Sequence, residues 1–291
     1  MHSDSSHVLG IDVSARTVER WRSWFAPEVQ PFHVDTDLRR VVGAGVPGHL
    51  PLELQDSFLL YGEEIRERVV GLDRPAFDAL PPGVRASLVR HQVASGRRLV
   101  PSLRSVPSAW RPALRQSGDG HRFVWWPDTL RECGDGPLLR FVADDLLASR
   151  HVQVSPSTWE RARAILPGAQ GLAGTYADCS GPNCFGTVMG AAGVDDAAET
   201  WMQREPFEEW LHDATRPGGD DARPGTVLVW RDRDGLALHA AVTLGDGWAL
   251  HKPSQGWMTP RKVLSVPDAK RRARQVGARL SRRLISPAWN D

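Results

Sequence analysis

The chain has 291 residues, of which 41% are hydrophobic and 24% charged, and its formal net charge at neutral pH is +1. A nearly neutral chain lacks the electrostatic field that binds nucleic acids or anionic membranes, so we expect neither as a partner. Three cysteines in a chain of this length do not form a disulfide framework, and their spacing fits no zinc site. We therefore expect no metal and no other cofactor.

The length favours two domains, which we place at residues 1–150 and 151–291. The first residues contain no basic segment followed by a long apolar run, and no later run approaches the roughly 20 apolar residues of a membrane span. The sequence therefore predicts a cytoplasmic protein. Arginine is abundant, whereas lysine occurs only at positions 252, 262 and 270, a bias typical of GC-rich genomes such as those of actinobacteria.

The first domain is expected to be mainly helical, with an unknown role. Apolar residues recur at helical spacing in Ser14–Phe25 and Gln55–Val70, and two more helices, Arg74–Leu80 and Val84–Ala94, flank a Pro-Pro-Gly turn. Several arginines make this region basic, and their simplest interpretation is a solvated helix face, the alternative being a site for an anionic ligand or partner. These are Arg85, Arg90, Arg97, Arg98 and Arg104.

The middle of the chain shows weaker patterns. Pro101–Gly120 is rich in Pro, Ser and Gly and is predicted to be a loop or linker, and His121–Trp126 to be a strand. Gly136–Leu147 and Ser157–Leu166 are predicted to be helices, the second one capped by Ser157 and ended by a Pro-Gly pair. Cys133 lies in this part of the chain and has no predicted role.

Two cysteines follow, one of which heads a predicted helix. Pro182 keeps Cys179 in a loop, whereas Asn183 is a good N-cap for a short helix over Phe185–Ala192, so Cys184 occupies its first position. A helix N-terminus stabilises a thiolate, and the N–H of Cys184 is a candidate oxyanion donor. We therefore take Cys184 as the nucleophile candidate, expect it to be alkylated faster than the other thiols, and keep Cys179 as the second choice.

A predicted hairpin then carries two histidines. Strands are expected at Thr226–Arg231, Ala237–Leu244 and Trp248–His251, with a three-residue turn Gly245–Gly247. That turn places His239 and His251 on one face as diagonal neighbours, whereas a two-residue loop would put them on opposite faces. The histidine face has small residues that leave room for the cysteine helix and a substrate, and the other is a core face. The histidine face carries Ala241, Thr243 and Ala249. The core face carries Ala240, Val242, Leu244, Trp248 and Leu250.

Such an arrangement suits a thiol enzyme, because a thiolate attacks a carbonyl, an imidazole moves the proton, and a third group orients the imidazole. We assign these roles to Cys184, His239 and His251. Gln255 and Trp257 follow His251 closely and are candidates for substrate contact, Trp257 as a cleft wall.

Four motifs also resemble one family. Asp178–Gly181 (Asp-Cys-Ser-Gly), Pro224–Trp230, His239–Gly247 and the position of His251 resemble NlpC-type cysteine peptidases, papain-like enzymes that cleave peptide bonds in bacterial cell walls. The resemblance spans about residues 171–266.

The resemblance implies an α+β fold: a papain-like core in which the nucleophile helix packs on an antiparallel sheet, preceded here by the mainly helical region. It also implies a role near the nucleophile for Tyr176, and Asn183 joins it as a candidate substrate contact. The chain departs from the family pattern at Pro182, which interrupts a helix after Cys179, and at Thr226, where the family has Asp.

Three functions remain open at this stage. The first is a cysteine-dependent amide hydrolase, a peptidase or amidase that acts through a thioester on a peptide or an amide-containing small molecule. The second is an acyl or peptidyl transferase that uses the same triad, and the third is a binding module on the same scaffold. Sequence alone separates neither these functions nor the substrates, because fold and triad are shared.

Overall fold

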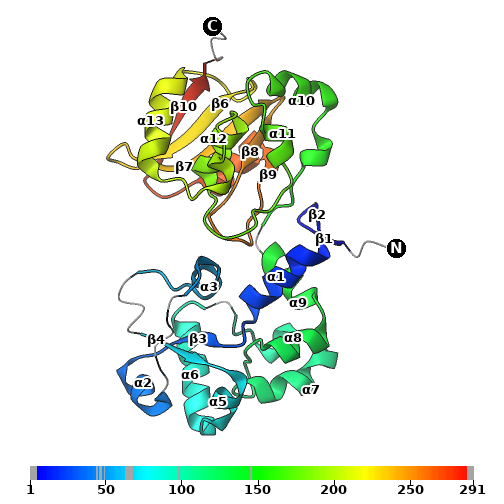
Figure 1. The fold of residues 1–291 in the computed structure, drawn as a ribbon, viewed down its shortest axis with the longest axis vertical. Helices are drawn as coiled ribbons and strands as arrows, with labels where there is room; N and C mark the ends of the chain where they lie inside the picture. The colour runs from blue at the N-terminus through cyan, green and yellow to red at the C-terminus, as the bar shows by residue number, and fades with distance from the viewer. Residues whose placement is uncertain are drawn as a thin grey trace. The chain divides into compact units, whose positions relative to one another are not determined.

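The computed structural model describes residues 5–43, 45, 48, 50–62, 68–97, 99–144 and 146–286. The chain forms two compact units, one of Met1–Ser6 with Val13–Asp144 and the other of His7–Asp12 with Asp145–Asp291 (Figure 1). The observed division lies a few residues before the expected one at residue 150. A short segment near the N-terminus also packs with the second unit, which no pattern in the sequence indicates.

The first unit combines helices with a two-stranded antiparallel sheet of β3 (Gln30–His33) and β4 (Val69–Leu72). Its helices are α1 (Ala15–Phe25), α2 (Thr36–Val42), α3 (Leu52–Phe58), α5 (Arg74–Ala79), α6 (Pro82–Ala94), α7 (Arg111–Leu114), α8 (Pro127–Cys133) and α9 (Gly136–Ala143). Short 3-10 helices are η1 (Leu103–Ser105), η2 (Ser108–Trp110) and η3 (Arg115–Ser117).

The helix predicted over Gln55–Val70 is wrong. Helix α3 ends at Phe58, because Leu59 takes a left-handed conformation with a φ of 58°. Residues 63–67 lie outside the described residues, as does Arg98. The last two residues of the predicted helix belong instead to β4, where pairing with β3 and burial against a common core outweigh the helical spacing.

The predictions for the next segment also need correction. Pro101–Gly120 contains η1, η2, α7 and η3 rather than a plain loop. The strand expected over His121–Trp126 is reduced to isolated bridges, Arg122 with Ser102 and Phe123 with Gly118. The helices over Ser14–Phe25, Arg74–Leu80 and Val84–Ala94 are confirmed to within two residues at either end.

The second unit is built on a six-stranded antiparallel sheet in the order β5-β10-β6-β7-β8-β9. Its strands are β5 (Thr215–Pro217), β6 (Thr226–Arg231), β7 (Ala237–Gly245), β8 (Trp248–His251), β9 (Lys262–Ser265) and β10 (Arg279–Ile285). The expected α+β class and the antiparallel central strands are confirmed. A hairpin of β1 (Ser6–Val8) and β2 (Ile11–Val13) reaches the unit through a bond from Ser149 N–H to Leu9 O of 2.7 Å.

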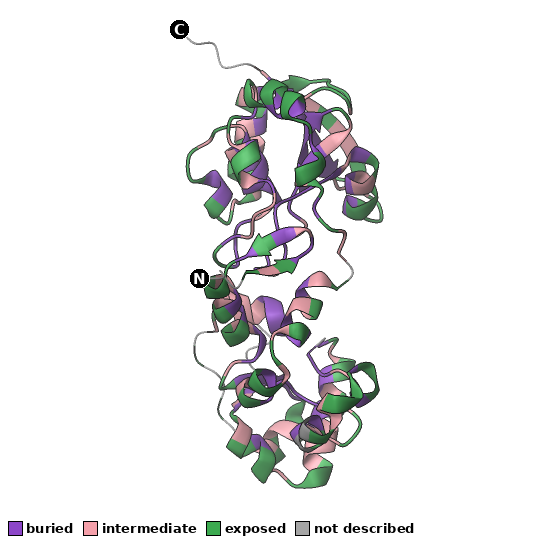
Figure 2. Cartoon of the chain, turned by 90° about the vertical axis from the view of Figure 1, so that its right-hand side faces the viewer, coloured by how far each residue is buried: buried purple, intermediate pink, exposed green. Residues whose placement is uncertain are grey.

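Helices cover both faces of this sheet. One face packs against α10 (Pro156–Arg163), α11 (Ala169–Leu172), α12 (Cys184–Ala191) and α13 (Arg204–Ala214), and the other against α14 (Val266–Ala273). Two further 3-10 helices are η4 (His151–Gln153) and η5 (Ala197–Glu199). Covered on both faces, the central strands are buried along most of their length (Figure 2). Alternate residues of each strand therefore enter two separate cores.

Candidate active site

Helix α12 begins at Cys184, as the sequence predicts. Asn183 has extended backbone angles, and its Oδ1 accepts a hydrogen bond of 3.0 Å from the N–H of Gly186, which caps the helix. Its Nδ2 donates to the carbonyl oxygen of Met202 at 2.7 Å. Both polar atoms of Asn183 therefore have partners within the fold, and its side chain caps the helix. The expected contact of Asn183 with substrate stays a prediction.

The thiol of Cys184 is buried beside strand β7. The side chain is 8% exposed and accepts a hydrogen bond from the backbone N–H of Ala240, the residue after His239. Burial raises the pKa of the thiol to about 11, although the backbone amides at Ala240, Phe185 and Cys184 itself and the Lys252 cation act in the opposite direction. At neutral pH the thiol is therefore protonated, because burial outweighs the helix N-terminus.

The two histidines form a hydrogen-bonded pair. His239 Nε2 lies 3.0 Å from His251 Nδ1, and the ring planes are inclined by 75°. Burial lowers the pKa of His239 to about 4. It also holds the pKa of His251 well below its usual value, and the repulsion between a charged His251 and protonated His239, Lys262 and Lys252 acts in the same direction. Both rings are therefore neutral imidazoles at neutral pH, each with one ring proton.

The tautomer of this pair decides what His239 can do. If His239 carries its proton on Nε2 and donates to His251, its Nδ1 is free to accept a proton. His251 then carries its own proton on Nε2, an atom that is buried and has no hydrogen-bond partner within the described part of the chain. The opposite tautomer leaves His239 protonated at Nδ1 and unable to act as a base.

The histidines share a face for a reason different from the expected one. Asp246 and Gly247 have φ angles of 51° and 79° and form a two-residue turn, because Gly245 pairs with Trp248. A bulge at Leu244 adds the residue that the shorter turn removes. The pairs Val242–Leu250 and Thr243–Ala249 consequently keep the predicted register, and both imidazoles point the same way.

The helix and the histidines approach the sheet from opposite sides. Cys184 belongs to the core cluster that includes Ala240 and Val242, whereas His239 is paired directly with Trp230, which belongs to the cluster beneath α14. The expectation that α12 covers the histidine face is therefore wrong. The small residues on that face accommodate α14, so the space expected for a substrate is filled.

The thiol nevertheless lies beside the residue that follows His239 in β7. Strand β8 ends at His251, and the N–H of Ala240 that bonds the thiol lies two residues beyond the last β7–β8 pair, Val242 with Leu250. Among the described residues, no hydrogen bond links the Cys184 thiol to either imidazole. Proton transfer between Cys184 and His239 therefore requires a side-chain rearrangement from the structure shown.

A buried lysine holds the loop that follows β8. Lys252 is fully buried, and its Nζ donates to the carbonyl oxygens of Ser254 at 2.8 Å, Gly256 at 3.2 Å and Thr259 at 2.8 Å, and to Thr259 Oγ1 at 3.1 Å. This role is not apparent from the sequence, since a lysine at a strand end is ordinarily solvated. The small residues Ser254, Gly256 and Thr259, which accept these bonds, follow it closely.

This loop is joined to the segment before α12. The N–H of Gly181 donates to the Gln255 carbonyl at 2.9 Å, and the N–H of Trp257 donates to Ser180 Oγ at 3.1 Å. Trp257 is fully buried, so the predicted cleft wall is wrong and the side chain belongs to the core. Gln255 is half-buried, and its carbonyl contact with Gly181 places it beside the segment that precedes α12.

Two other candidates lie in the same segment. Tyr176 is half-buried, and burial raises its pKa well above the usual range, so its phenol stays protonated. Cys179 is exposed in the loop ahead of the helix cap. The structure therefore brings Tyr176, Cys179 and Gln255 into joined segments, and Cys184 contacts the strand that carries His239.

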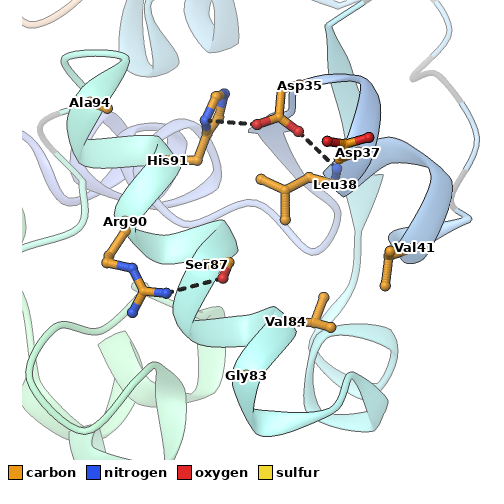
Figure 3. Close-up of a pocket in the computed structure, with 10 residues that line it drawn as sticks. All are labelled: Asp35, Asp37, Leu38, Val41, Gly83, Val84, Ser87, Arg90, His91 and Ala94. Atoms are coloured by element: carbon orange, nitrogen blue, oxygen red, sulfur yellow. Dashed lines mark hydrogen bonds and ion pairs between the residues drawn. The ribbon is translucent and has the colours of Figure 1, made fainter.

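A separate groove of about 650 Å³ lies in the first unit, between α2 and α6 (Figure 3). Asp35 lies 3.8 Å from His91 Nδ1 on its rim, and Arg90 donates to Ser87 Oγ at 3.0 Å. The floor is apolar, formed by residues such as Leu38 and Val84. The groove has no cysteine, serine–histidine contact or other activated nucleophile among its lining residues, so it is not a second candidate for covalent chemistry.

Residues 5–286, apart from the gaps given above, contain no group of three or more His, Cys, Asp or Glu side chains arranged to hold a metal ion. The same residues include no helix both long and apolar enough to cross a membrane. No protein-family model, no curated protein and no solved structure matches the chain.

Proposed function

We propose that the second unit is a papain-like cysteine hydrolase of amide bonds, in which Cys184, His239 and His251 carry the reaction. The observation that supports this best is the contact between the Cys184 thiol and the N–H of Ala240. It holds a sulfur atom at a helix N-terminus one residue from an imidazole that is itself hydrogen-bonded to a second imidazole. This order of nucleophile, base and orienting group is that of a thiol catalytic triad.

The reaction starts from a neutral pair. The side chains first rearrange so that the imidazole reaches the thiol. His239 Nδ1 then takes the proton from the Cys184 thiol as the sulfur attacks the carbonyl carbon of the substrate, and the N–H of Cys184 stabilises the oxyanion. The amine then leaves with the proton from His239, and a thioester remains on Cys184. Water, deprotonated by His239, attacks the thioester and releases the acid. Throughout, His251 accepts the hydrogen bond from His239 Nε2 and keeps the other nitrogen available.

One observation favours acyl transfer as a second candidate. Cys184, His239 and His251 are 8%, 6% and 2% exposed, so the reacting groups lie in a site that water enters poorly. A thioester formed there meets water less readily than a bound amine does, and an amine acceptor would convert the same intermediate into a new amide.

The experiment is acylation of the full chain by a p-nitrophenyl ester of an N-acetylated amino acid, followed by intact-mass and peptide-mass analysis. We expect one acyl group on Cys184, lost in Cys184→Ser and retained in Cys179→Ser, which controls for the exposed thiol nearby. His239→Ala should slow acylation by about 100-fold or more, the usual contribution of a general base. Acylation that is equal in the wild-type chain and Cys184→Ser would contradict the proposal and favour a binding module.

Turnover separates the two reaction classes. Addition of glycinamide to the acylated chain yields the amide product if the site transfers acyl groups, whereas release of the free acid at an unchanged rate identifies a hydrolase. Iodoacetamide is a poor reporter here, because Cys179 is exposed and the Cys184 thiol is buried and protonated. We now expect Cys179 to be alkylated first, the reverse of the order predicted from the sequence.

A further inference from the structure

Three arginines of the first unit surround a pocket of about 290 Å³. Arg74 begins α5, Arg85 lies in the first turns of α6, and Arg115 begins η3, so three separate segments bring their guanidinium groups to one place. Asp78 and Gly118 complete the lining. Of the arginines for which the sequence suggests an anion site as the alternative, Arg85 lines this pocket.

The carboxylates nearby do not balance these cations. Asp78 accepts a hydrogen bond of 2.6 Å from Arg74 Nε and lies 3.7 Å from Arg85 Nη1. Asp128 lies 3.5 Å from Arg74 Nη1. Arg115 has no ion-pair partner among the described residues, so one positive charge remains in excess. Like charges gathered in a partly enclosed space repel one another unless an anion joins them.

The side chain of Arg85 is partly enclosed. It is 23% exposed, and its Nε is shielded from solvent without any hydrogen-bond acceptor in the described part of the chain. Among the described residues, Arg97, Arg111 and Arg261 share this feature, so it is the convergence of three cations on one pocket, not the buried Nε, that favours an anion there.

The segment that carries Arg115 is held close to the rest of the pocket. Gly118 pairs with Phe123 in an isolated bridge, and a Cβ atom at Gly118 would come within 1.9 Å of the Arg122 carbonyl oxygen. No larger residue fits there without moving backbone. Arg115 lies three residues before Gly118, so backbone pairing fixes the segment that carries it.

We propose that this pocket binds a compact tetrahedral dianion, the kind of group that the phosphoryl end of a small molecule supplies. Guanidinium groups present planar pairs of N–H donors that match phosphoryl oxygens, and three of them from separate segments surround such a group better than they surround a planar carboxylate. Asp78 keeps Arg74 and Arg85 in place, and Arg115 supplies the uncompensated charge. The proposal does not depend on the function of the second unit.

The test is a titration of the full chain with inorganic phosphate at constant ionic strength. Binding is measured by calorimetry and by the shift in melting temperature. We expect saturable binding that is weakened about 10-fold or more in Arg115→Gln, the loss of one charge-assisted contact. Arg115 is exposed and has no ion-pair partner among the described residues, so this variant should keep its fold. Arg85→Gln should weaken binding similarly.

Arg90→Gln is the matched control, because Arg90 lies on the same helix as Arg85, is exposed and lines the other groove. It should bind phosphate as the wild-type chain does. Sulfate should compete with phosphate, and acetate should not. Vesicles of phosphatidylcholine with and without phosphatidic acid distinguish a soluble ligand from a lipid headgroup. If the pocket binds a lipid headgroup, the vesicles with phosphatidic acid retain the wild-type chain and do not retain Arg115→Gln. Absence of saturable phosphate binding, or equal losses in Arg90→Gln and Arg115→Gln, would overturn the proposal.

Discussion

Both units contain buried cations, and two of them, Arg97 and Lys252, are held differently. Arg97 in the first unit is 3% exposed, lies between the rings of Phe32 and Phe58 at 4.7 and 4.4 Å from their centroids, and donates to Gln30 Oε1 at 2.6 Å. Lys252 in the second unit is fully buried and donates to oxygens of Ser254, Gly256 and Thr259, all within seven residues of itself. Arg97 thus links distant segments, whereas Lys252 organises its own loop.

The difference follows from the chemistry of the two side chains. A guanidinium group is planar, stacks on aromatic rings and directs its donors in a fixed plane, so it suits a core assembled from strands and helices far apart in sequence. An ammonium group is a compact charge with donors in several directions, so it suits a cage of carbonyl groups in a tight loop. Burial lowers the pKa of Arg97 to about 9, which still leaves it charged at neutral pH.

The largest loss of stability is expected when Arg97 is replaced. Arg97→Ala removes the donor to Gln30 and to the Pro31 carbonyl and opens a cavity between two aromatic rings. We expect the free energy of unfolding of the first unit to fall by about 4 kcal/mol. Hydrogen exchange resolved by mass spectrometry measures it, because peptides of α6 and β7 report on the two units separately. Arg90→Ala, on the exposed side of α6, is the control, and an equal loss of protection in β7 would contradict local action.

Acid should act more strongly on the second unit. The pKa of His239 is about 4 in the fold and about 6.5 in the unfolded chain, so between these values the unfolded state binds a proton that the folded state excludes. Stability is therefore complete above pH 6.5 and decreases by about 3 kcal/mol as the pH falls to 4. His251 adds to this slope. Burial also lowers the pKa of His33 in the first unit, but its bond to the Phe58 carbonyl opposes the shift, so the first unit should respond less.

Urea unfolding between pH 4.5 and 7, followed through peptides of each unit, measures the two slopes. His239→Gln should flatten the slope of the second unit and leave that of the first unit unchanged. If the variant retains the wild-type slope, the acid sensitivity comes from other groups.

These two units also differ in how far their structures could be predicted. In the second unit the strands β6, β7 and β8 have apolar runs bounded by glycines, and the register of the histidine hairpin follows from them, since the Leu244 bulge compensates the shorter turn. In the first unit β4 has a helical spacing of apolar residues, and only its pairing with β3 decides its structure. Local patterns therefore fail where a long-range partner determines the element.

The candidate site shows the same limit. The helix cap at Asn183, the position of Cys184 and the bond between His239 and His251 follow from local sequence and register. The face of the sheet that α12 covers depends on how the whole chain packs, so it cannot be predicted from a local pattern. The burial of Trp257 and Lys252 depends likewise on contacts between separate loops, such as the bond from Trp257 N–H to Ser180.

A smaller effect is expected when Lys252 is replaced. Lys252→Met leaves the carbonyl oxygens of Ser254, Gly256 and Thr259 without their shared donor, and we expect a loss of about 2 kcal/mol in the second unit, because water partly replaces the ammonium group. The joined segment at Gly181 and Trp257 should exchange its amide protons faster. Lys270→Met, a change at a half-buried lysine of α14, is the control. Unaltered exchange at Gly181 in Lys252→Met would show that the loop is held by other contacts.

The smallest effects come from two carboxylates that pair with arginine, one in each unit. Asp135 accepts bonds of 2.7 and 2.9 Å from Arg22, and Glu208 accepts bonds of 2.5 and 2.9 Å from Arg231. Glu208 also accepts the N–H of Ala237 at 3.0 Å, at the start of the strand that carries His239. We therefore expect Glu208→Gln to cost about 1 kcal/mol and Asp135→Asn less, because its pair is more exposed and makes no such backbone contact.

The pH dependence of these carboxylates sharpens the difference between them. Burial by itself would raise the pKa of Glu208, but the bonds from Arg231 and Ala237 outweigh it and hold the pKa below its usual value. A carboxylate with a lowered pKa stabilises the fold above the pKa of the unfolded chain, and this contribution disappears as the pH falls through the folded value. The stability difference between the wild-type chain and Glu208→Gln should consequently be present at pH 7 and vanish in strong acid, as measured by urea unfolding. A difference that persists in acid would mean that the amide disrupts the contact with Ala237 itself, so that geometry rather than charge joins α13 to β7.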